Sequence, residues 1–315
     1  MNAMQPYLAI LPEVSLVLVA LLVLLFDALW DEERRRNLGW LTFGGVALTL
    51  VLTVALGRPG AQPQSLWGGM LRHDWLGFTF GLIFLFGAGI TALLGMDIPA
   101  LGRRGEFYIL LLVSTIGMTL MAAAGDIIML FLAIETTSIP LYILAGFFTK
   151  DEKSTEAGFK YLLFGAMTSS VMLYGFSLLY GFTSATGFEG VAAGLSDEPL
   201  ALVLGVLMLL LVGFGFKVSI FPLHFWAPDV YEGAPTPVAG FLSTASKAAG
   251  FAVLMRVLVT VFPASQGYWQ GLVAVVSAIT MTLGNLLAIN QKNIKRMLAY
   301  SRLHTLATPW WALWP

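Results

Sequence analysis

Long apolar runs recur along the whole chain and are separated by short polar segments. A helix needs about 20 apolar residues to cross the hydrocarbon core of a bilayer. Lipid cannot satisfy free backbone groups, so such runs must be helical. The pattern predicts an all-α, polytopic transmembrane helix bundle with nine spans, over residues 7–29, 38–57, 76–96, 107–125, 127–148, 160–182, 200–221, 238–262 and 268–290. A tenth apolar stretch begins near Met297, but prolines interrupt it and it is too short to predict as a span.

Basic residues in the polar connections lie almost entirely on one side of the predicted membrane. The even-numbered connections hold only Arg58 and Arg72, whereas the odd-numbered ones hold Arg34, Arg35, Arg36, Arg103, Arg104, Lys150, Lys153, Lys160, Lys292, Lys295 and Arg296. Cytoplasmic loops carry an excess of Lys and Arg. The asymmetry therefore predicts a multi-pass membrane protein with its N-terminus outside.

Composition agrees with this reading and excludes several kinds of chemistry. The chain is 58% hydrophobic and 11% charged, against about 25% charged residues in soluble domains. It has no cysteine, which excludes iron–sulfur clusters, thiolate metal sites and disulfides within the chain. The net charge of −1 and the lack of a long basic run give no indication of nucleic-acid binding.

Two lysines fall inside predicted spans. Lys247 has nine residues before it in its span and fifteen after it, so about 13 Å of helix separates it from the nearer end. A charge at that depth is expensive and usually marks an ion or proton path. Lys217 lies five residues before Pro222 and could instead extend its side chain to water. Arg256 is six residues from its helix end, and we expect it to reach water in this way.

Glu135 is the acidic residue that lies deep inside a predicted span. Burial favours the neutral form of a lysine and a nearby carboxylate favours the charged form. Glu135 is therefore the natural partner for Lys217 or Lys247, and the pair would form a switchable proton site. The alternative is a neutral carboxyl group that hydrogen-bonds between helices. Thr136, Thr137 and Ser138 beside it could hold water or bond across helices.

The seventh connection, Pro222–Pro237, reads PLHFWAPDVYEGAPTP, with four prolines and no Lys or Arg. It predicts a broken helix or a packed re-entrant segment, since irregular backbone at membrane depth is tolerated only against protein or a water cavity. His224 could relay protons near neutral pH or be a packed loop residue. The spacing of His224, Asp229 and Glu232 matches no metal-ligand motif, so we expect no metal site. Around Lys247, water could be ordered by small polar residues that would equally suit helix packing, namely Ser243, Thr244 and Ser246.

Four strings together make a family resemblance: AIETTSIPLYIL, GFKVSIFPLHFWAPDVYEGAPTPV, STASKAAGF and QKNIKRMLAYS, which begin at residues 133, 215, 243 and 291. They resemble subunit N of NADH–quinone oxidoreductase, respiratory complex I. This subunit belongs to the antiporter-like membrane subunits, which also occur in multisubunit cation/proton antiporters. The resemblance covers essentially residues 1–301.

The resemblance implies a fold and a set of site residues. The family has fourteen helices, with two inverted five-helix repeats that each contain a discontinuous helix. By this likeness, residues 1–106 are three N-terminal helices, 107–262 form the first repeat, and 263–301 begin the second. The family's channel glutamate falls on Glu135, its broken-helix lysine on Lys217, its central lysine on Lys247 and the histidine between them on His224.

The end of the chain departs from the family pattern. After Ser301 the family continues roughly Ser-Ile-Ala-Tyr-Ala-Gly-Tyr, whereas this chain reads RLHTLATPWW from Arg302. A codon string for the family sequence, read one base later, gives the same letters as this chain. We therefore predict a one-base frameshift ahead of Arg302, in the gene or in its sequencing, and assign no function to residues 302–315. A chain that lacks the rest of the second repeat is expected to be inactive or unassembled.

The resemblance implies a proton-translocating membrane subunit of the NADH:quinone oxidoreductase, with no redox chemistry in this chain itself. NADH, FMN, iron–sulfur clusters and quinone would belong to the whole complex. The expected partners are the other membrane subunits of complex I, the lipid bilayer, protons, and quinone through the complex. Two alternatives stay open: a subunit of a multisubunit Na⁺/H⁺ antiporter, and a structural membrane subunit that does not pump.

Overall fold

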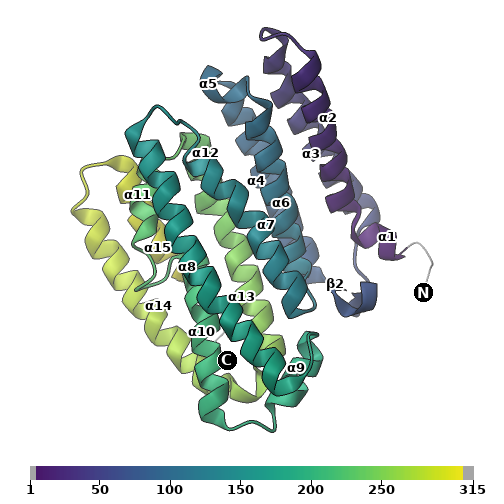
Figure 1. Cartoon of the computed structure of the whole chain (residues 1–315), viewed down its shortest axis with the longest axis vertical. Coiled ribbons are helices and arrows are strands. Elements are labelled where there is room, and N and C mark those ends of the chain that lie inside the picture. The colour runs from purple at the N-terminus through teal and green to yellow at the C-terminus, as the bar shows by residue number, and fades with distance from the viewer. Residues whose placement is uncertain (1–4, 308–315) are drawn as a thin grey trace. The chain divides into compact units, whose positions relative to one another are not determined.

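The structure, a computed structural model, describes residues 5–307 and is predominantly helical (Figure 1). Within this part of the chain, nine helical segments are long and apolar enough to cross a membrane. They are α2 (Leu11–Leu29), α3 (Asn37–Leu56, preceded by η1, Arg34–Arg36), α4 (Trp75–Met96), α6 (Gly105–Ala123), α7 (Ile127–Ala145), α8 (Glu152–Thr183), α10 (Leu200–Val218), the run α12 (Thr236–Phe241), η3 (Leu242–Ser246) and α13 (Lys247–Val261), and α14 (Gln266–Ile289, preceded by η4, Pro263–Ser265).

Shorter elements connect these helices. The helical ones are α1 (Gln5–Ala9), η2 (Trp67–Gly69), α5 (Pro99–Gly102), α9 (Phe188–Leu195), α11 (Trp226–Gly233) and α15 (Ile294–Ala307). The strands β1 (Gln64–Leu66) and β2 (Leu71–His73) pair antiparallel in a hairpin between α3 and α4. At its tip Gly68 and Gly69 have φ of 69° and 94°, values that favour glycine.

The predicted all-α bundle and its nine spans are confirmed, with shifts at some ends. The sixth span begins at Glu152, not at 160, because the preceding Asp151 caps α8 by accepting a hydrogen bond from the backbone N–H of Lys153 (3.0 Å). The helix break predicted in the seventh connection is also confirmed, since α10 ends at Val218 and α11 begins only at Trp226. The predicted tail extends past α15, and residues 308–315 lie outside the described part of the chain. The frameshift therefore stays a prediction.

The chain divides into two compact units. Unit 1 comprises Met1–Leu144 and Thr236–Ala252, and unit 2 comprises Ala145–Pro235 and Val253–Pro315. Within unit 1, α2, α3, α4 and α6 pack side by side. Helices α6 and α7 approach so closely that a Cβ on Gly117 would lie 2.5 Å from the backbone nitrogen of Thr137. The proposed repeat boundaries do not coincide with these units and stay a prediction.

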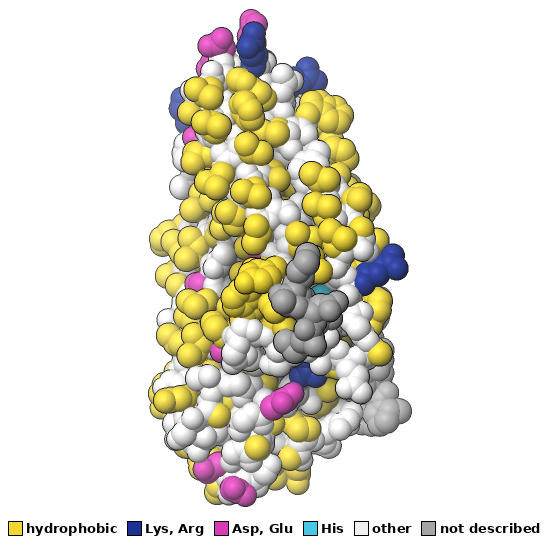
Figure 2. Space-filling model, turned by 90° about the vertical axis from the view of Figure 1, so that its right-hand side faces the viewer, with side chains coloured by type: hydrophobic (Ala, Val, Ile, Leu, Met, Phe, Trp, Pro, Cys, Tyr) yellow, Lys and Arg dark blue, Asp and Glu magenta, His cyan; other side chains and the backbone are white. Residues whose placement is uncertain are grey.

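Large apolar side chains are exposed along many of the spans. Leu18, Phe86 and Ile143 are all more than half exposed. Figure 2 shows one face of the molecule, on which hydrophobic side chains cover much of the middle while acidic and basic side chains gather at the upper end. Exposed apolar patches of this extent mark a surface that contacts lipid or other protein.

Candidate functional site

In unit 1, Glu135 lies at the middle of α7 and is half-buried. Tyr142, which is 6% exposed, interacts electrostatically with Glu135 and hydrogen-bonds to Ser138. Residues three, four and seven apart share one face of a helix. Glu135, Ser138 and Tyr142 therefore form a polar stripe on α7, to which sequence reasoning did not assign Tyr142.

The hydroxyl groups beside Glu135 are mostly directed at their own helix. Thr136 donates to the Leu132 carbonyl (2.8 Å) and Thr137 to the Ala133 carbonyl (2.9 Å). Ser138 likewise donates to Ile134. Thr137 in addition approaches the sulfur of Met121 on α6 (3.2 Å), so the predicted contact across helices is confirmed for this residue.

Lys247, also in unit 1, is 1% exposed and is among the largest fully buried side chains. It directly follows η3, a π-helical turn over Leu242–Ser246. Such turns are rare and occur frequently at functional sites. The sequence placed Lys247 inside a span but gave no signal for the turn.

The π-helical turn is packed tightly against α4. A Cβ on Gly87 would lie 3.2 Å from the Cβ of Ala245 and within 4 Å of Phe241. The hydroxyls of Ser243 and Thr244 both donate to the Gly240 carbonyl, at 2.9 and 2.8 Å. These two side chains therefore satisfy their own helix, as the helix-packing alternative expects.

In unit 2, Lys217 lies in the last turn of α10 and is 6% exposed. The next turn does not form, because Ser219 adopts a left-handed conformation (φ 57°) and ends the helix. A cation near a helix C-terminus is favoured by the backbone carbonyls that point that way. The break thus provides an electrostatic reason for a buried ammonium group at this position.

Two hydrogen bonds fix the segment between α10 and α11. The indole N–H of Trp226 donates to the Phe216 carbonyl (3.1 Å), and the backbone N–H of Phe221 donates to the hydroxyl of Thr280 on α14 (3.1 Å). His224 lies in this segment and is 4% exposed, with its ring 4.6 Å from that of Phe225. His224 is therefore a packed residue of the break, in the same unit as Lys217.

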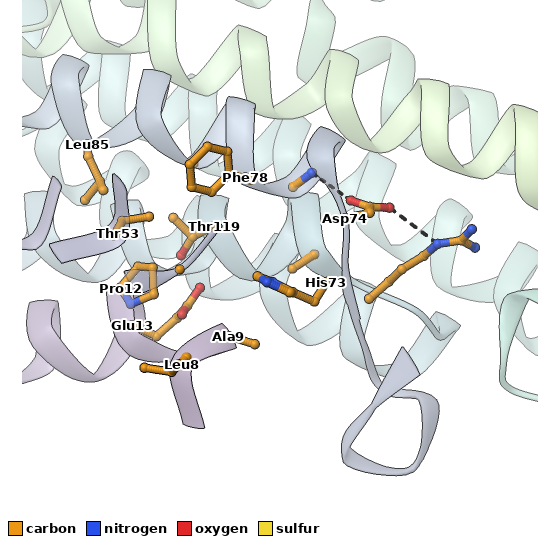
Figure 3. A pocket seen from close by; sticks show the side chains of 15 residues that line it. Leu8, Ala9, Pro12, Glu13, Thr53, His73, Asp74, Phe78, Leu85 and Thr119 are labelled. Atoms are coloured by element: carbon orange, nitrogen blue, oxygen red, sulfur yellow. Dashed lines mark hydrogen bonds and ion pairs between the residues drawn. The ribbon is translucent and has the colours of Figure 1, made fainter. Parts of the chain in front are cut away.

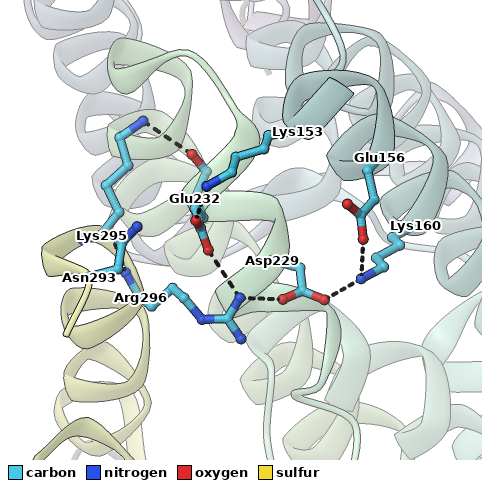
Figure 4. A network of polar contacts seen from close by, with 8 residues as sticks. All are labelled: Lys153, Glu156, Lys160, Asp229, Glu232, Asn293, Lys295 and Arg296. Carbon is cyan, nitrogen blue, oxygen red and sulfur yellow. Dashed lines mark hydrogen bonds and ion pairs between the residues drawn. The ribbon is translucent and has the colours of Figure 1, made fainter. Parts of the chain in front are cut away.

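At the other end of α11, an ionic cluster ties three helices of unit 2 together (Figure 4). Arg296 of α15 reaches both acidic residues of α11, Asp229 at 2.7 Å and Glu232 at 3.0 Å. Lysines of α8 bind the remaining oxygens, Lys153 with Glu232 (2.7 Å) and Lys160 with Asp229 (2.5 Å). Asp229 and Glu232 thus serve as anchors of α11.

The surroundings in this ionic cluster change the pKa values of its residues. Hydrogen bonds from Lys153 and Arg296 lower the pKa of Glu232 below its ordinary value. Burial lowers the pKa of Lys295, whose ammonium group donates to the backbone carbonyls of Glu232 (3.4 Å) and Ala234 (3.1 Å). At neutral pH the ion pairs of Glu232 are therefore fully formed.

Two buried ionisable residues were missed or misjudged from sequence. Arg256 was expected to extend to water, but it is 5% exposed, so that expectation is wrong. Distance to the helix end gives no information on burial by other parts of the protein. Glu13 has a side-chain oxygen, Oε2, that is buried. Glu13, the third residue of α2, was not predicted to be buried, because nothing in the sequence indicated a covering element.

The four predicted site residues are divided between the units, with Glu135 and Lys247 in unit 1 and Lys217 and His224 in unit 2.

An apolar cavity of about 230 Å³ lies beside the break in unit 2 and is lined by residues of α10, the break and α14, among them Phe221, Pro222 and Val276. Among the described side chains, no group of three or more His, Asp or Glu is placed to hold a metal ion.

Residues 124–309 match the family described as "NADH:quinone oxidoreductase/Mrp antiporter, TM". The chain is 40% identical over 352 residues to NADH-quinone oxidoreductase subunit N 1 of Roseiflexus castenholzii, covering 93% of this chain and 64% of the relative. It is 41% identical to subunit N of Desulfovibrio desulfuricans, covering 94% and 60%. In the solved structure of respiratory complex I from Thermus thermophilus with bound aureothin, one chain is 33% identical with a TM-score of 0.80, covering 96% of this chain and 64% of that one. The chain therefore spans about three fifths of the length of its curated relatives.

Proposed function

The chain belongs to the NADH:quinone oxidoreductase/Mrp antiporter family of transmembrane subunits, and from this we propose that it is a proton-translocating membrane subunit of an NADH–quinone oxidoreductase. The curated relatives named subunit N support this assignment. We further propose that α6 to α13 correspond to the first antiporter-like repeat and that α14 begins the second.

One observation carries the proposal: Lys247 is 1% exposed within a helical run long enough to span a membrane. A buried ammonium group is expensive unless its charge is compensated or its proton can leave. Unlike arginine, lysine can lose its proton in such an environment. A group of this kind can take up a proton and pass it on.

We propose that Glu135, Lys217, His224 and Lys247 form the proton relay. Ionisation of Glu135 favours the charged form of Lys217, and its protonation favours the neutral form. A proton released from Lys217 passes by water and the imidazole of His224 to neutral Lys247, which then becomes charged. Moving one charge against the membrane potential takes about 2.3 kcal/mol per 100 mV, so the relay must be driven from outside this chain.

In this proposal, redox energy reaches the chain from its partners. NADH, FMN, iron–sulfur clusters and quinone belong to other subunits of the complex, and this chain contacts neighbouring membrane subunits and lipid. Its place is the cell inner membrane with the N-terminus outside, which is supported by the one-sided distribution of Lys and Arg in the connections.

The deciding experiment replaces Lys247 by alanine in a full-length subunit that carries the complete second repeat, assembled in the complex and reconstituted in proteoliposomes. We expect normal assembly and a loss of proton pumping of about a hundredfold, the scale on which a positioned proton-transfer group acts. Lys292→Ala, at an exposed lysine, is the matched control and should pump normally. Normal pumping by the Lys247→Ala complex would instead make the chain a structural subunit.

A cation/proton antiporter subunit is the second candidate, and the family description includes Mrp antiporters. The two candidate functions can be distinguished by the energy source that drives proton movement. Proton pumping that needs NADH and quinone, and that persists without sodium, supports the oxidoreductase. Proton movement driven by a sodium gradient alone would support the antiporter.

A further inference from the structure

A small polar cavity lies in unit 1 where the N-terminal end of α2 meets the β1–β2 hairpin (Figure 3). Its volume is about 40 Å³, which is room for one or two water molecules. Apolar residues of α1 and α4 line part of it. The polar residues come from α2, α3, β2, α6 and the segment after β2, and they are Glu13, Thr53, Arg72, His73, Asp74 and Thr119. None of these residues belongs to the proposed relay.

Glu13 is the group that gives this cavity its chemistry. The carboxyl group interacts with the hydroxyl of Thr119 on α6 and with its own backbone. Its second oxygen, Oε2, is buried and has no hydrogen-bond partner among the described residues. A buried polar atom without a partner is costly, and such atoms are usually satisfied by water where a polar cavity has room for it. Glu13 faces this cavity (Figure 3).

His73 lines the same cavity from the hairpin, with its ring toward the side where Glu13 lies (Figure 3). One ring nitrogen hydrogen-bonds to the backbone of Arg58, and burial lowers the pKa of His73 below its ordinary value. His73 is therefore neutral near pH 7. A neutral imidazole that donates from one nitrogen can accept a proton at the other.

The remaining charges around the cavity are mutually compensated. Arg72 pairs with Asp74 at 3.4 Å, and Asp74 also caps α4 by accepting from the backbone N–H of Gly77 (2.9 Å). The guanidinium group of Arg58 donates to the Val54 carbonyl (2.8 Å). Of the titratable residues that line the cavity with Glu13, Arg72 and Asp74 pair with each other, so cavity water and His73 are the groups that exchange a proton with Glu13.

We propose that Glu13, water in this cavity and His73 form a proton-exchange site at the N-terminal end of α2. The proton leaves Oε2 of Glu13 for the water, and the water gives a proton to the free nitrogen of His73. The resulting imidazolium releases a proton to bulk water, and the reverse sequence reloads Glu13. This site is separate from the Glu135–Lys247 residues and does not rest on the proposed function.

Infrared difference spectroscopy of the full chain in lipid nanodiscs tests the site. Stepping the pH from neutral to acidic in the wild type should produce a carbonyl band of a protonated carboxyl group. Glu13→Gln keeps the size of the side chain and should abolish this band, and Glu13→Asp should keep a shifted band. In His73→Phe the band should remain, but its exchange with deuterium should slow about a hundredfold, because the proton acceptor is lost.

Glu106→Gln is the matched control, since Glu106 is also an acidic residue in the first turn of a span but is exposed. It should leave the band and its exchange unchanged. If the wild type shows no such band, Glu13 only caps its helix as an ionised side chain and the proposal fails. It also fails if the band survives in Glu13→Gln, or if exchange is as fast in His73→Phe as in the wild type.

Discussion

Lys247 and Lys217 are both buried, but the helices that hold them are built differently. Lys247 follows a π-helical turn inside one continuous helical run, and that turn is held by apolar contact with α4. Lys217 lies in the last turn of α10, which ends at Val218, and the next helix, α11, begins only at Trp226. There the backbone is held by Trp226 and by the ionic cluster on Asp229 and Glu232.

This difference separates two ways of positioning a buried charge. Close apolar packing does not depend on salt or on protonation, whereas ion pairs at the surface are weakened by both. The region of Lys247 should therefore tolerate changes of pH and salt but not changes of side-chain volume. The region of Lys217 should be sensitive to pH and salt but should tolerate changes of side-chain volume.

The largest expected effect comes from Lys247→Arg. Arginine keeps the charge but does not release its proton, and it is bulkier than the lysine that is fully buried there. Proton pumping in proteoliposomes of the assembled complex should fall about a hundredfold. Lys217→Arg also removes a proton-releasing group and should lose pumping as well, but it should lower the thermal stability of the complex less than Lys247→Arg does, because Lys217 lies beside irregular backbone and not inside a continuous helical run. Equal losses of thermal stability would show that the two environments do not differ as described.

Gly87→Leu tests the apolar support of the π-helical turn. A side chain at this position meets Ala245 and Phe241, and overpacking of this kind destabilises by about 1–3 kcal/mol. The measurement is thermal unfolding of the full chain in nanodiscs. Gly44→Leu is the matched control, since a Cβ there meets nothing within 4 Å, and an equal loss in the control would contradict the assignment.

Arg296→Gln tests the ionic support of α11. The change removes the bonds to Asp229 and Glu232 and should destabilise by about 1 kcal/mol, because the pairs are partly exposed. High salt should reduce the difference between the wild type and the variant. The Gly87→Leu effect should not change with salt, and a similar response in both variants would remove the distinction.

Acid pH should give the smallest and most selective effect. The folded-state pKa of Glu232 lies below its ordinary value of 4.5, so its stabilisation is present above pH 4.5 and is lost as the pH falls through the folded value. The folded-state pKa of His73 lies below 6.5, so the hairpin in unit 1 loses stability as the pH falls below 6.5 towards the folded value. Thermal unfolding against pH should show both steps. Glu232→Gln should remove only the lower one, and its persistence would assign it to another carboxyl group.

The sequence predicted the spans well because a membrane-spanning helix is recognised from its own length and hydrophobicity. It also placed Lys247 far from either end of its span, in agreement with its burial, whereas it left the burial of Lys217 open. Other features depend on neighbours that are distant in sequence. Arg296 meets Asp229 across 67 residues, and no local pattern encodes that pairing. The burial of Arg256 and of Glu13 was missed for the same reason, because other elements cover residues that lie near their helix ends.

The π-helical turn before Lys247 fits one extra residue into the helical repeat. Each residue turns an α-helix by about 100°, so the azimuth of the Lys247 side chain depends on that insertion and not on the hydrophobicity of the run. Deleting one residue from Leu242–Ser246 would restore regular winding and aim the amine about a quarter of a turn away. The direction in which the ammonium group points therefore depends on the number of residues in the turn that precedes it.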